Sequence, residues 1–301
     1  MTRTRRSVLL LFAALTCAGL GLSAQSAPAP TPIALWPHGA PGAVGNEPQD
    51  IPTITPYMVP SSRSTGAAFV VYPGGGYRMI SKHEGEPIAL WLNKLGISAF
   101  VVTYRVGPRY HYPAPILDGE RAVRYVRSHA AQYGIDPHKI GIIGFSAGGH
   151  LAVTVGTHFD DGNPQAADPI DRVSDRPDLM ILVYALIGID LDVPGGSSRP
   201  MLLGDHPTQA MIDLLSNEKH VTAQTPPTFM VQATDDPWVH VENCLLFAGA
   251  LRQAGVPFEL HLFQHGPHGF GLADGNGSPN TPRLAIWTQL AANWLKLQLS
   301  D

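Results

Sequence analysis

The segment around Ser146 constrains the fold of this chain more than any other part of the sequence. Residues 140–144 form an isoleucine-rich run, a Gly-x-Ser-x-Gly pattern centred on Ser146 follows, and residues 151–155 are again apolar. This order predicts a strand, a sharp turn and a helix, with the serine oxygen held clear of the backbone at the turn. The two glycines let strand and helix approach without a Cβ clash. We therefore predict that Ser146 is a nucleophile; the alternative is a serine that only closes the turn.

Backbone amides are expected on two sides of this serine. The helix that follows it directs its first N–H groups, that of Ala147 included, and a partial positive charge toward the serine. On the other side, residues 67–72 have the pattern of a buried strand and lead into the glycine-rich segment 73–77. Successive glycines let amides turn inward. We predict that Ala147 and Gly75 or Gly76 form an oxyanion hole; the alternative for the glycines is a flexible loop.

The other apolar segments alternate between strand and helix patterns, which predicts an α/β fold. Strands are expected at residues 67–72, 98–103, 140–144, 179–184, 228–233 and 257–263, and helices at 84–95, 117–133, 241–254 and 284–297. Alternation of this kind is typical of a mostly parallel, doubly wound sheet with helices on both faces. Residues 186–227 form a long insertion with a short helix near residues 210–215. No linker divides the chain, so we expect one domain over residues 28–301, without a large separate cap.

The first 27 residues have the pattern of a secretory signal. Arg3, Arg5 and Arg6 precede the apolar run 8–15, and small residues follow as far as Ala27. The apolar run is too short for a lasting membrane span, so we expect removal of the segment and a secreted or periplasmic protein. The twin arginines loosely resemble a twin-arginine export signal. An uncleaved anchor is the alternative.

The charge and cysteine content of the chain limit the partners and cross-links that we expect. The chain has 20 Lys and Arg against 24 Asp and Glu, a formal net charge of −4, so there is no basic excess to indicate nucleic acid. Removal of the signal would leave Cys244 as the single cysteine, which excludes an internal disulfide. The oligomeric state is left open.

A base and an acid that could act with Ser146 follow two of the predicted strands. Strand 228–233 leads to Asp235 and Asp236, and strand 257–263 leads to His265 and His268. Carboxyl ends of parallel strands meet at one edge of a sheet, where ligands bind. The chain order Ser, Asp, His is that of α/β-hydrolases, in which the histidine is the base and the acid orients it. We predict the catalytic set Ser146, Asp236 and His268.

Two choices within this set stay open. The Asp-x-x-Val pattern beginning at Asp236 favours that residue over Asp235, and the His-Gly pair after the loop favours His268 over His265. The three neighbouring histidines, which include His261, could also indicate a metal. His261 lies within a strand, however, and no carboxylate or cysteine set is near, so we expect neither a metal nor a cofactor.

The segments quoted so far resemble the bacterial esterases related to hormone-sensitive lipase. They are most similar to a secreted acetylxylan-esterase-like branch, the xylanase-associated esterases. The shared segments are residues 35–42, 73–77, 83–85, 136–141, 144–152, 202–204, 225–229 and 268–271, and they cover nearly the whole chain after the signal. One departure is Pro73, which stands where this group often has a histidine before three glycines. The imidazole that would brace the loop is therefore absent.

The resemblance implies an α/β-hydrolase fold and a serine carboxylesterase that removes short acyl groups. The implied substrates are acetyl esters of xylan-type carbohydrate, as small molecules or oligosaccharides. Feruloyl or general aryl esters are an alternative. A peptidase of the prolyl-oligopeptidase type would share the catalytic set, although the chain has no length for the propeller that such enzymes usually carry. A non-catalytic binding module is the third alternative, against which the complete Ser, Asp and His set argues.

Two aromatic residues are candidates for substrate binding. Tyr77 directly follows the glycine loop, and Trp238 lies two residues after Asp236. Both should therefore lie at the catalytic edge of the sheet, where an aromatic face suits the apolar side of a sugar ring. The alternative is that one or both pack beneath a loop.

Overall fold

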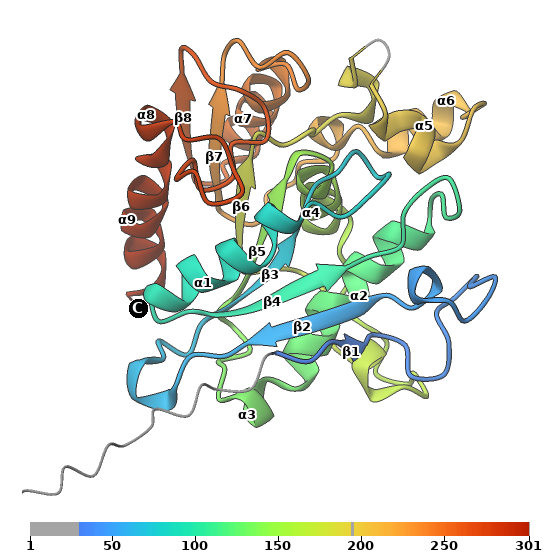
Figure 1. Ribbon diagram of the computed structural model, residues 1–301. Helices are drawn as coiled ribbons and strands as arrows, with labels where there is room; N and C mark the ends of the chain where they lie inside the picture. Colours follow the sequence, from blue (N-terminus) through green and yellow to red (C-terminus); the bar gives the residue numbers. More distant parts are fainter. Residues whose placement is uncertain (1–29, 194–195, 301) are drawn as a thin grey trace, which may run out of the picture.

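The computed structural model describes residues 30–193 and 196–300 and has a single eight-stranded sheet, in the order β1-β2-β4-β3-β5-β6-β7-β8 (Figure 1). The strands are β1 Ile33–Ala34, β2 Thr53–Tyr57, β3 Ala68–Tyr72, β4 Ser98–Thr103, β5 Ile140–Phe145, β6 Leu179–Val183, β7 Thr228–Ala233 and β8 Phe258–Phe263. From β4 to β8 every neighbouring pair is parallel, while β1 and β2 run antiparallel at one edge. The predicted signal segment, residues 1–27, lies outside the described residues.

Helices cover both faces of the sheet, and the strand sequences explain why. Side chains of a strand point alternately to the two faces. In β3, Val70 belongs to one buried apolar cluster, which also holds residues of α2 and α4, whereas Phe69 and Val71 belong to a second cluster with α1 and α9. A parallel strand between two helical layers needs apolar residues on both sides. Every residue of β3, β5, β6 and β7 is accordingly buried.

The helices agree with the predicted alternation and differ in detail. They are α1 Glu86–Lys94, α2 Ala114–Ser128, α3 Ala130–Tyr133, α4 Ser146–His158, α5 Ser198–Leu203, α6 Gln209–Leu214, α7 Glu242–Ala254, α8 Pro282–Ala285 and α9 Trp287–Leu299. The helix expected at residues 117–133 begins three residues earlier and is divided after Ser128. The insertion after β6 carries two short helices, α5 and α6 (Figure 1), rather than one. Pro200 is the third residue of α5, and the sequence does not indicate this helix because a proline usually interrupts a helical pattern.

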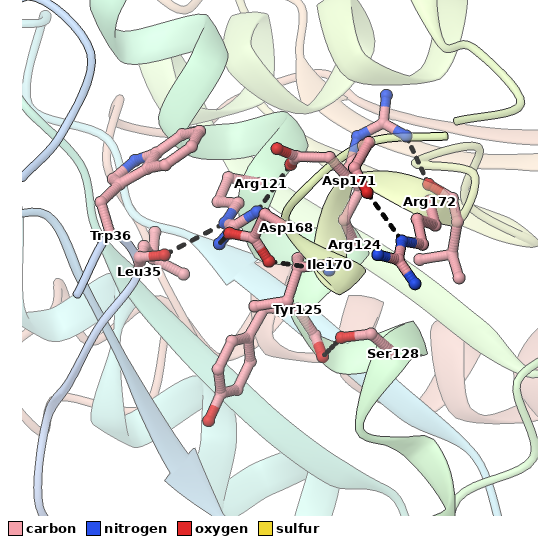
Figure 2. A network of polar contacts seen from close by, with 12 residues as sticks. Leu35, Trp36, Arg121, Arg124, Tyr125, Ser128, Asp168, Ile170, Asp171 and Arg172 are labelled. Carbon is pink, nitrogen blue, oxygen red and sulfur yellow. Dashed lines mark hydrogen bonds and ion pairs between the residues drawn. The ribbon is translucent and has the colours of Figure 1, made fainter. Parts of the chain in front are cut away.

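The segment before β2 is hydrogen-bonded to helix α2 through Arg121. Figure 2 shows this side chain between the Leu35–Trp36 segment and the 3-10 turn η4, Pro169–Arg172. Its guanidinium donates to the Leu35 carbonyl and to the carboxylates of Asp168 and Asp171, and it lies 4.5 Å from the Trp36 ring centroid. A buried cation needs such partners. The Leu-Trp motif therefore contributes to structure at this position.

No helix of the described residues has the length and apolar character needed to cross a bilayer.

Candidate active site

Ser146 lies on a strained turn between β5 and α4, as the sequence predicts. Its φ is +51°, a value that residues other than glycine seldom adopt. The close approach of strand and helix depends on the two glycines. A Cβ on Gly148 would lie 2.2 Å from the Tyr72 carbonyl oxygen, and one on Gly144 would lie 2.4 Å from the Gly148 carbonyl oxygen. Larger residues at either position would displace the backbone that holds the serine.

The structure brings Ser146, His268 and Asp236 into one hydrogen-bonded line. The Ser146 Oγ lies 2.8 Å from His268 Nε2, and His268 Nδ1 lies 2.7 Å from Asp236 Oδ2. The three residues follow β5, β8 and β7, so the common carboxyl edge of the sheet places them together. A proton on Nδ1 donates to the carboxylate and leaves Nε2 to accept from the serine hydroxyl. This is the arrangement in which histidine can act as a general base.

The turn after β7 fixes the Asp236 carboxylate. Its Oδ1 accepts the backbone N–H groups of Trp238 at 2.9 Å and Val239 at 3.0 Å. The second oxygen, Oδ2, is thereby left to face His268. Asp236 is 4% exposed, so these three donors take the place of water around it.

Asp235 and His265 form a separate pair. Asp235 Oδ2 lies 2.8 Å from His265 Nδ1, and Oδ1 accepts the Gly266 N–H at 2.8 Å. Both side chains are exposed. His261, from β8, bonds Glu259 on the same strand. Among the described residues no group of three or more His, Cys, Asp or Glu side chains could hold a metal ion.

The glycine loop curls over the other side of Ser146. Gly75 and Gly76 have φ values of +123° and +63°, and both line the same cavity as Ser146 and His268. A Cβ on Gly75 would lie 2.1 Å from the Met79 carbonyl oxygen, so the curl requires glycine there. Ala147 is the second residue of α4, and its amide is one of the first-turn donors without an intrahelical acceptor. Gly75 and Gly76 thus line the cavity that holds the serine, and Ala147 follows the serine at the start of α4.

Two residues that the sequence did not indicate hold this loop. The Gly74 N–H donates to Glu84 Oε2 at 2.7 Å, and the Tyr104 hydroxyl donates to the Pro73 carbonyl at 2.6 Å. A carboxyl group therefore braces the loop in which Pro73 replaces the expected imidazole. The apolar spacing predicts that Glu84 begins a helix; instead Glu84 ends the 3-10 turn η3, Lys82–Glu84, and α1 begins two residues later.

The cavity at the serine has a volume of about 280 Å³. Its walls come from the glycine loop, the turn η3, the loops after β7 and β8, and the insertion that carries α5. The lining residues are Gly75, Gly76, Ser81, His83, Glu84, Ser146, Asp192, Val193, Gly196, Ser197, Ser198, Trp238, Val239, His268 and Gly269. Trp238 is 59% exposed, so its ring is accessible to a ligand in this cavity.

The prediction that Tyr77 offers a face to substrate is wrong. Its side chain is fully buried, and its hydroxyl lies 2.9 Å from His150 Nδ1. The ring packs edge-on against Tyr104, with centroids 6.0 Å apart. Such a large ring contributes more by packing beneath the loop, where its hydroxyl has a partner, than by facing water.

The buried Tyr77–His150 contact is uncharged. Burial lowers the pKa of His150 to about 4, and burial raises the pKa of Tyr77 well above its ordinary value. Near neutral pH the Tyr77 hydroxyl therefore donates to His150 Nδ1, and Nε2–H donates to the Leu215 carbonyl at 2.9 Å. This chain of bonds links Tyr77, at the end of the glycine loop, through His150 of α4 to the Leu215 carbonyl.

Comparison with known proteins identifies the family. The BD-FAE family model matches residues 57–251. The chain is 41% identical over 211 residues to endo-1,4-β-xylanase B of Butyrivibrio fibrisolvens, a match that covers 68% of this chain and 32% of that protein. It is 36% identical over 221 residues to an acetylxylan esterase of Xylanibacter ruminicola, with coverages of 69% and 42%. The chain thus spans about a third to two fifths of the length of these curated relatives.

The fold has a similar relative among solved structures. The crystal structure of an acetyl ester-xyloside bifunctional hydrolase from Caldicellulosiruptor lactoaceticus superposes with a TM-score of 0.82 at 45% identity. The match covers 89% of this chain and 96% of that one. It confirms the α/β-hydrolase fold that the order of strands and helices predicts, and the resemblance to acetylxylan-esterase-like proteins is confirmed with it. The chain belongs to the BD-FAE family of α/β-hydrolases.

Proposed function

We propose that this protein is a serine carboxylesterase in which Ser146 is the nucleophile. The observation that supports this most strongly is the unbroken line from Ser146 Oγ through His268 to Asp236, with contacts of 2.8 and 2.7 Å. The line ends at a strained turn that opens into a cavity. Strain at a non-glycine residue persists where the surrounding structure enforces it, and it gathers at functional sites.

The geometry supports an acyl-enzyme mechanism. His268 Nε2 takes the Ser146 proton as Oγ attacks the ester carbonyl, and Asp236 stabilises the imidazolium that forms. The carbonyl oxygen becomes an oxyanion, which the amides of Ala147 and of Gly75 or Gly76 would stabilise. His268 then protonates the departing alcohol oxygen. Water, deprotonated by the same histidine, attacks the acyl group and releases the acid and free serine.

The substrate class we propose is short-chain acyl esters, with acetyl groups on xylan-type carbohydrate as the natural target. Three observations support it. The matches to an acetylxylan esterase and to an acetyl ester-xyloside bifunctional hydrolase cover most of this chain. The exposed Trp238 ring borders the cavity, where it can pack on the apolar side of a sugar ring. A cavity of about 280 Å³ suits a short acyl group.

A substrate panel tests this proposal. We would measure kcat/KM for p-nitrophenyl acetate, acetylated xylo-oligosaccharides, methyl ferulate and a prolyl peptide anilide, with Ser146→Ala as control. The proposal predicts turnover of both acetate esters, slower turnover of ferulate, and none of the anilide above the Ser146→Ala background. A preference for ferulate would change the acyl assignment, and turnover of the anilide would indicate a peptidase.

We also propose that the protein is exported and that residues 1–27 are removed. The three arginines before an apolar run and small residues support this. Amino-terminal sequencing of the extracellular or periplasmic protein should begin within residues 24–30. A first residue of Met1 in that material would contradict the proposal.

A further inference from the structure

The side chain of Glu84 bonds to the glycine loop and to Tyr184, the residue that follows β6. It is 3% exposed. Its Oε2 accepts the Gly74 N–H at 2.7 Å, and its Oε1 accepts the Tyr184 hydroxyl at 2.7 Å. Gly74 begins the glycine loop, which carries the proposed oxyanion donors. One oxygen of this carboxyl group thus holds that loop, and the other faces the residue after β6.

Tyr184 extends this contact to the loop that carries His268. Its hydroxyl accepts the Gly271 N–H at 2.9 Å, while its ring packs edge-on against His268 at a centroid distance of 5.1 Å. The backbone holds Tyr184 at a φ of +37°, which is unfavourable for a bulky residue. Burial and the neighbouring Glu84 raise the pKa of the phenol well above its ordinary value, so it stays a donor to Glu84.

His83, beside Glu84, makes a second bridge between the same two loops. Its Nε2 lies 3.1 Å from the Gly269 carbonyl, and its Nδ1 lies 3.1 Å from the Ser81 Oγ. The Ser81 N–H donates in turn to the Gly74 carbonyl at 3.0 Å. A turn of four residues, 81–84, is therefore bonded on one side to the glycine loop and on the other to the histidine loop.

We infer that Glu84 is a positioning residue that holds the oxyanion donors and His268 in register on opposite sides of Ser146, with Tyr184 as the relay. This inference rests on the proposed esterase function. The Gly74 amide donates to Glu84, and this anchors the point from which Gly75 and Gly76 curl over the cavity. Oxyanion donors act within 2.7–3.1 Å of the oxygen they stabilise, so a loop that loses its anchor loses that alignment.

Four variants test the inference with p-nitrophenyl acetate. Glu84→Gln keeps the size of the side chain and removes one acceptor, and Tyr184→Phe removes only the hydroxyl and keeps the ring on His268. The third is the double variant. The matched control is Tyr72→Phe, because Tyr72 is also fully buried and donates its hydroxyl to a backbone carbonyl, that of Gly119, at 2.8 Å on the α2 side.

The expected result is a loss in kcat with little change in KM. A displacement of catalytic groups by about 1 Å can reduce the rate roughly 10²-fold, so we expect each single variant to lose about 10- to 100-fold. The double variant should lose no more than the worse single one, because both changes cut the same link. Tyr72→Phe should lower the melting temperature comparably and leave kcat unchanged.

The inhibition constant of phenylboronic acid is a second measurement, and it should not change if Glu84 and Tyr184 only stabilise the fold. Boronic acids form a tetrahedral anionic adduct with a nucleophilic serine, so their affinity reports the oxyanion donors. The inhibition constant should weaken in Glu84→Gln and Tyr184→Phe by about the same factor as kcat falls. If Glu84→Gln does not fold, Tyr184→Phe alone carries the test.

Failure of the inference can be told from failure of the proposed function. Activity that survives in a folded Ser146→Ala protein, or a wild type that phenylboronic acid does not inhibit, would overturn the function and the inference with it. If Ser146→Ala is inactive but Glu84→Gln and Tyr184→Phe keep the wild-type kcat and inhibition constant, only the inference is overturned. Losses that multiply in the double variant would also overturn it, because the two residues would then act separately.

Discussion

Two Asp–His pairs lie side by side at the carboxyl edge of the sheet, and their contact distances hardly differ. Asp236 and His268 meet at 2.7 Å, and Asp235 and His265 at 2.8 Å. The side chains of the first pair are 0% and 18% exposed, whereas those of the second are 48% and 68% exposed. Only the first pair reaches Ser146 within the described residues.

The comparison shows that environment, rather than contact distance, separates a pair suited to catalysis from one that is not. Asp236 lies where backbone N–H groups replace water and fix one of its oxygens. Asp235 accepts one backbone N–H, but 48% of its side chain is exposed to solvent. Exposed ion pairs of this kind contribute little to stability, because solvent screens the attraction between the two charges.

Neutralising each aspartate in turn tests whether only the buried one orients the catalytic histidine. Asp236→Asn should lower kcat by about 10⁴-fold, because the amide would face His268 Nδ1 with a donor and leave the proton on Nε2, where it cannot accept from Ser146. Asp235→Asn should change kcat by less than about threefold, as expected for an exposed pair. Steady-state kinetics on p-nitrophenyl acetate measure both. The reverse ranking would assign the orienting role to Asp235.

A third histidine extends the comparison from catalysis to stability. Because burial lowers the pKa of His150 to about 4 from an ordinary 6.5, the unfolded chain binds a proton in this range that the folded chain does not. Above pH 6.5 the imidazole is neutral in both states, and His150 does not lower the free energy of unfolding. This free energy falls by about 3 kcal/mol as the pH drops from 6.5 to 4, because only the unfolded chain binds the proton there.

Urea unfolding of the wild type and two variants measures this effect. His150→Gln, which can still accept from Tyr77 and donate to Leu215, should lose less stability than the wild type between neutral pH and about pH 4.5. His265→Gln, at the exposed pair, should follow the wild type. Equal acid sensitivity in all three proteins would show that His150 does not titrate as its burial implies.

A smaller effect is expected at Trp238, whose backbone N–H supports Asp236 while its ring faces solvent. Trp238→Ala keeps the backbone contact and should weaken kcat/KM for acetylated xylo-oligosaccharides by roughly 1–2 kcal/mol, with almost no change for p-nitrophenyl acetate. Binding energy remote from the reacting bond matters only for a substrate that reaches it. Leu246→Ala, a similarly exposed apolar residue on α7, is the control. Equal losses on both substrates would favour a packing role for Trp238.

Much of the fold and the serine turn could be predicted from the sequence because they follow local rules. Apolar periodicity located every parallel strand, and glycines on either side of Ser146 indicated the tight turn that the structure contains. The pairing of distant strand ends followed from parallel topology. Each of these rules needs only residue types and their spacing along the chain.

The remaining features depend on side-chain direction, which spacing does not determine. Tyr77 follows the glycine loop as Trp238 follows Asp236, yet the first ring turns inward and the second outward. Glu84 fitted the start of a helix, and its role became visible only when Gly74 and Tyr184 were placed beside it. The choice between Asp235 and Asp236 required the backbone of the turn, because adjacent side chains point in different directions.

In the mechanism that we propose, Ser146 is activated by the buried Asp236–His268 pair and forms a covalent acyl-enzyme. Mass spectrometry of the protein after treatment with a fluorophosphonate tests it most directly. We expect one adduct per chain, located on the peptide that contains Ser146, and loss of both the adduct and esterase activity in a folded Ser146→Ala protein. An adduct on another residue, or full activity in Ser146→Ala, would contradict it.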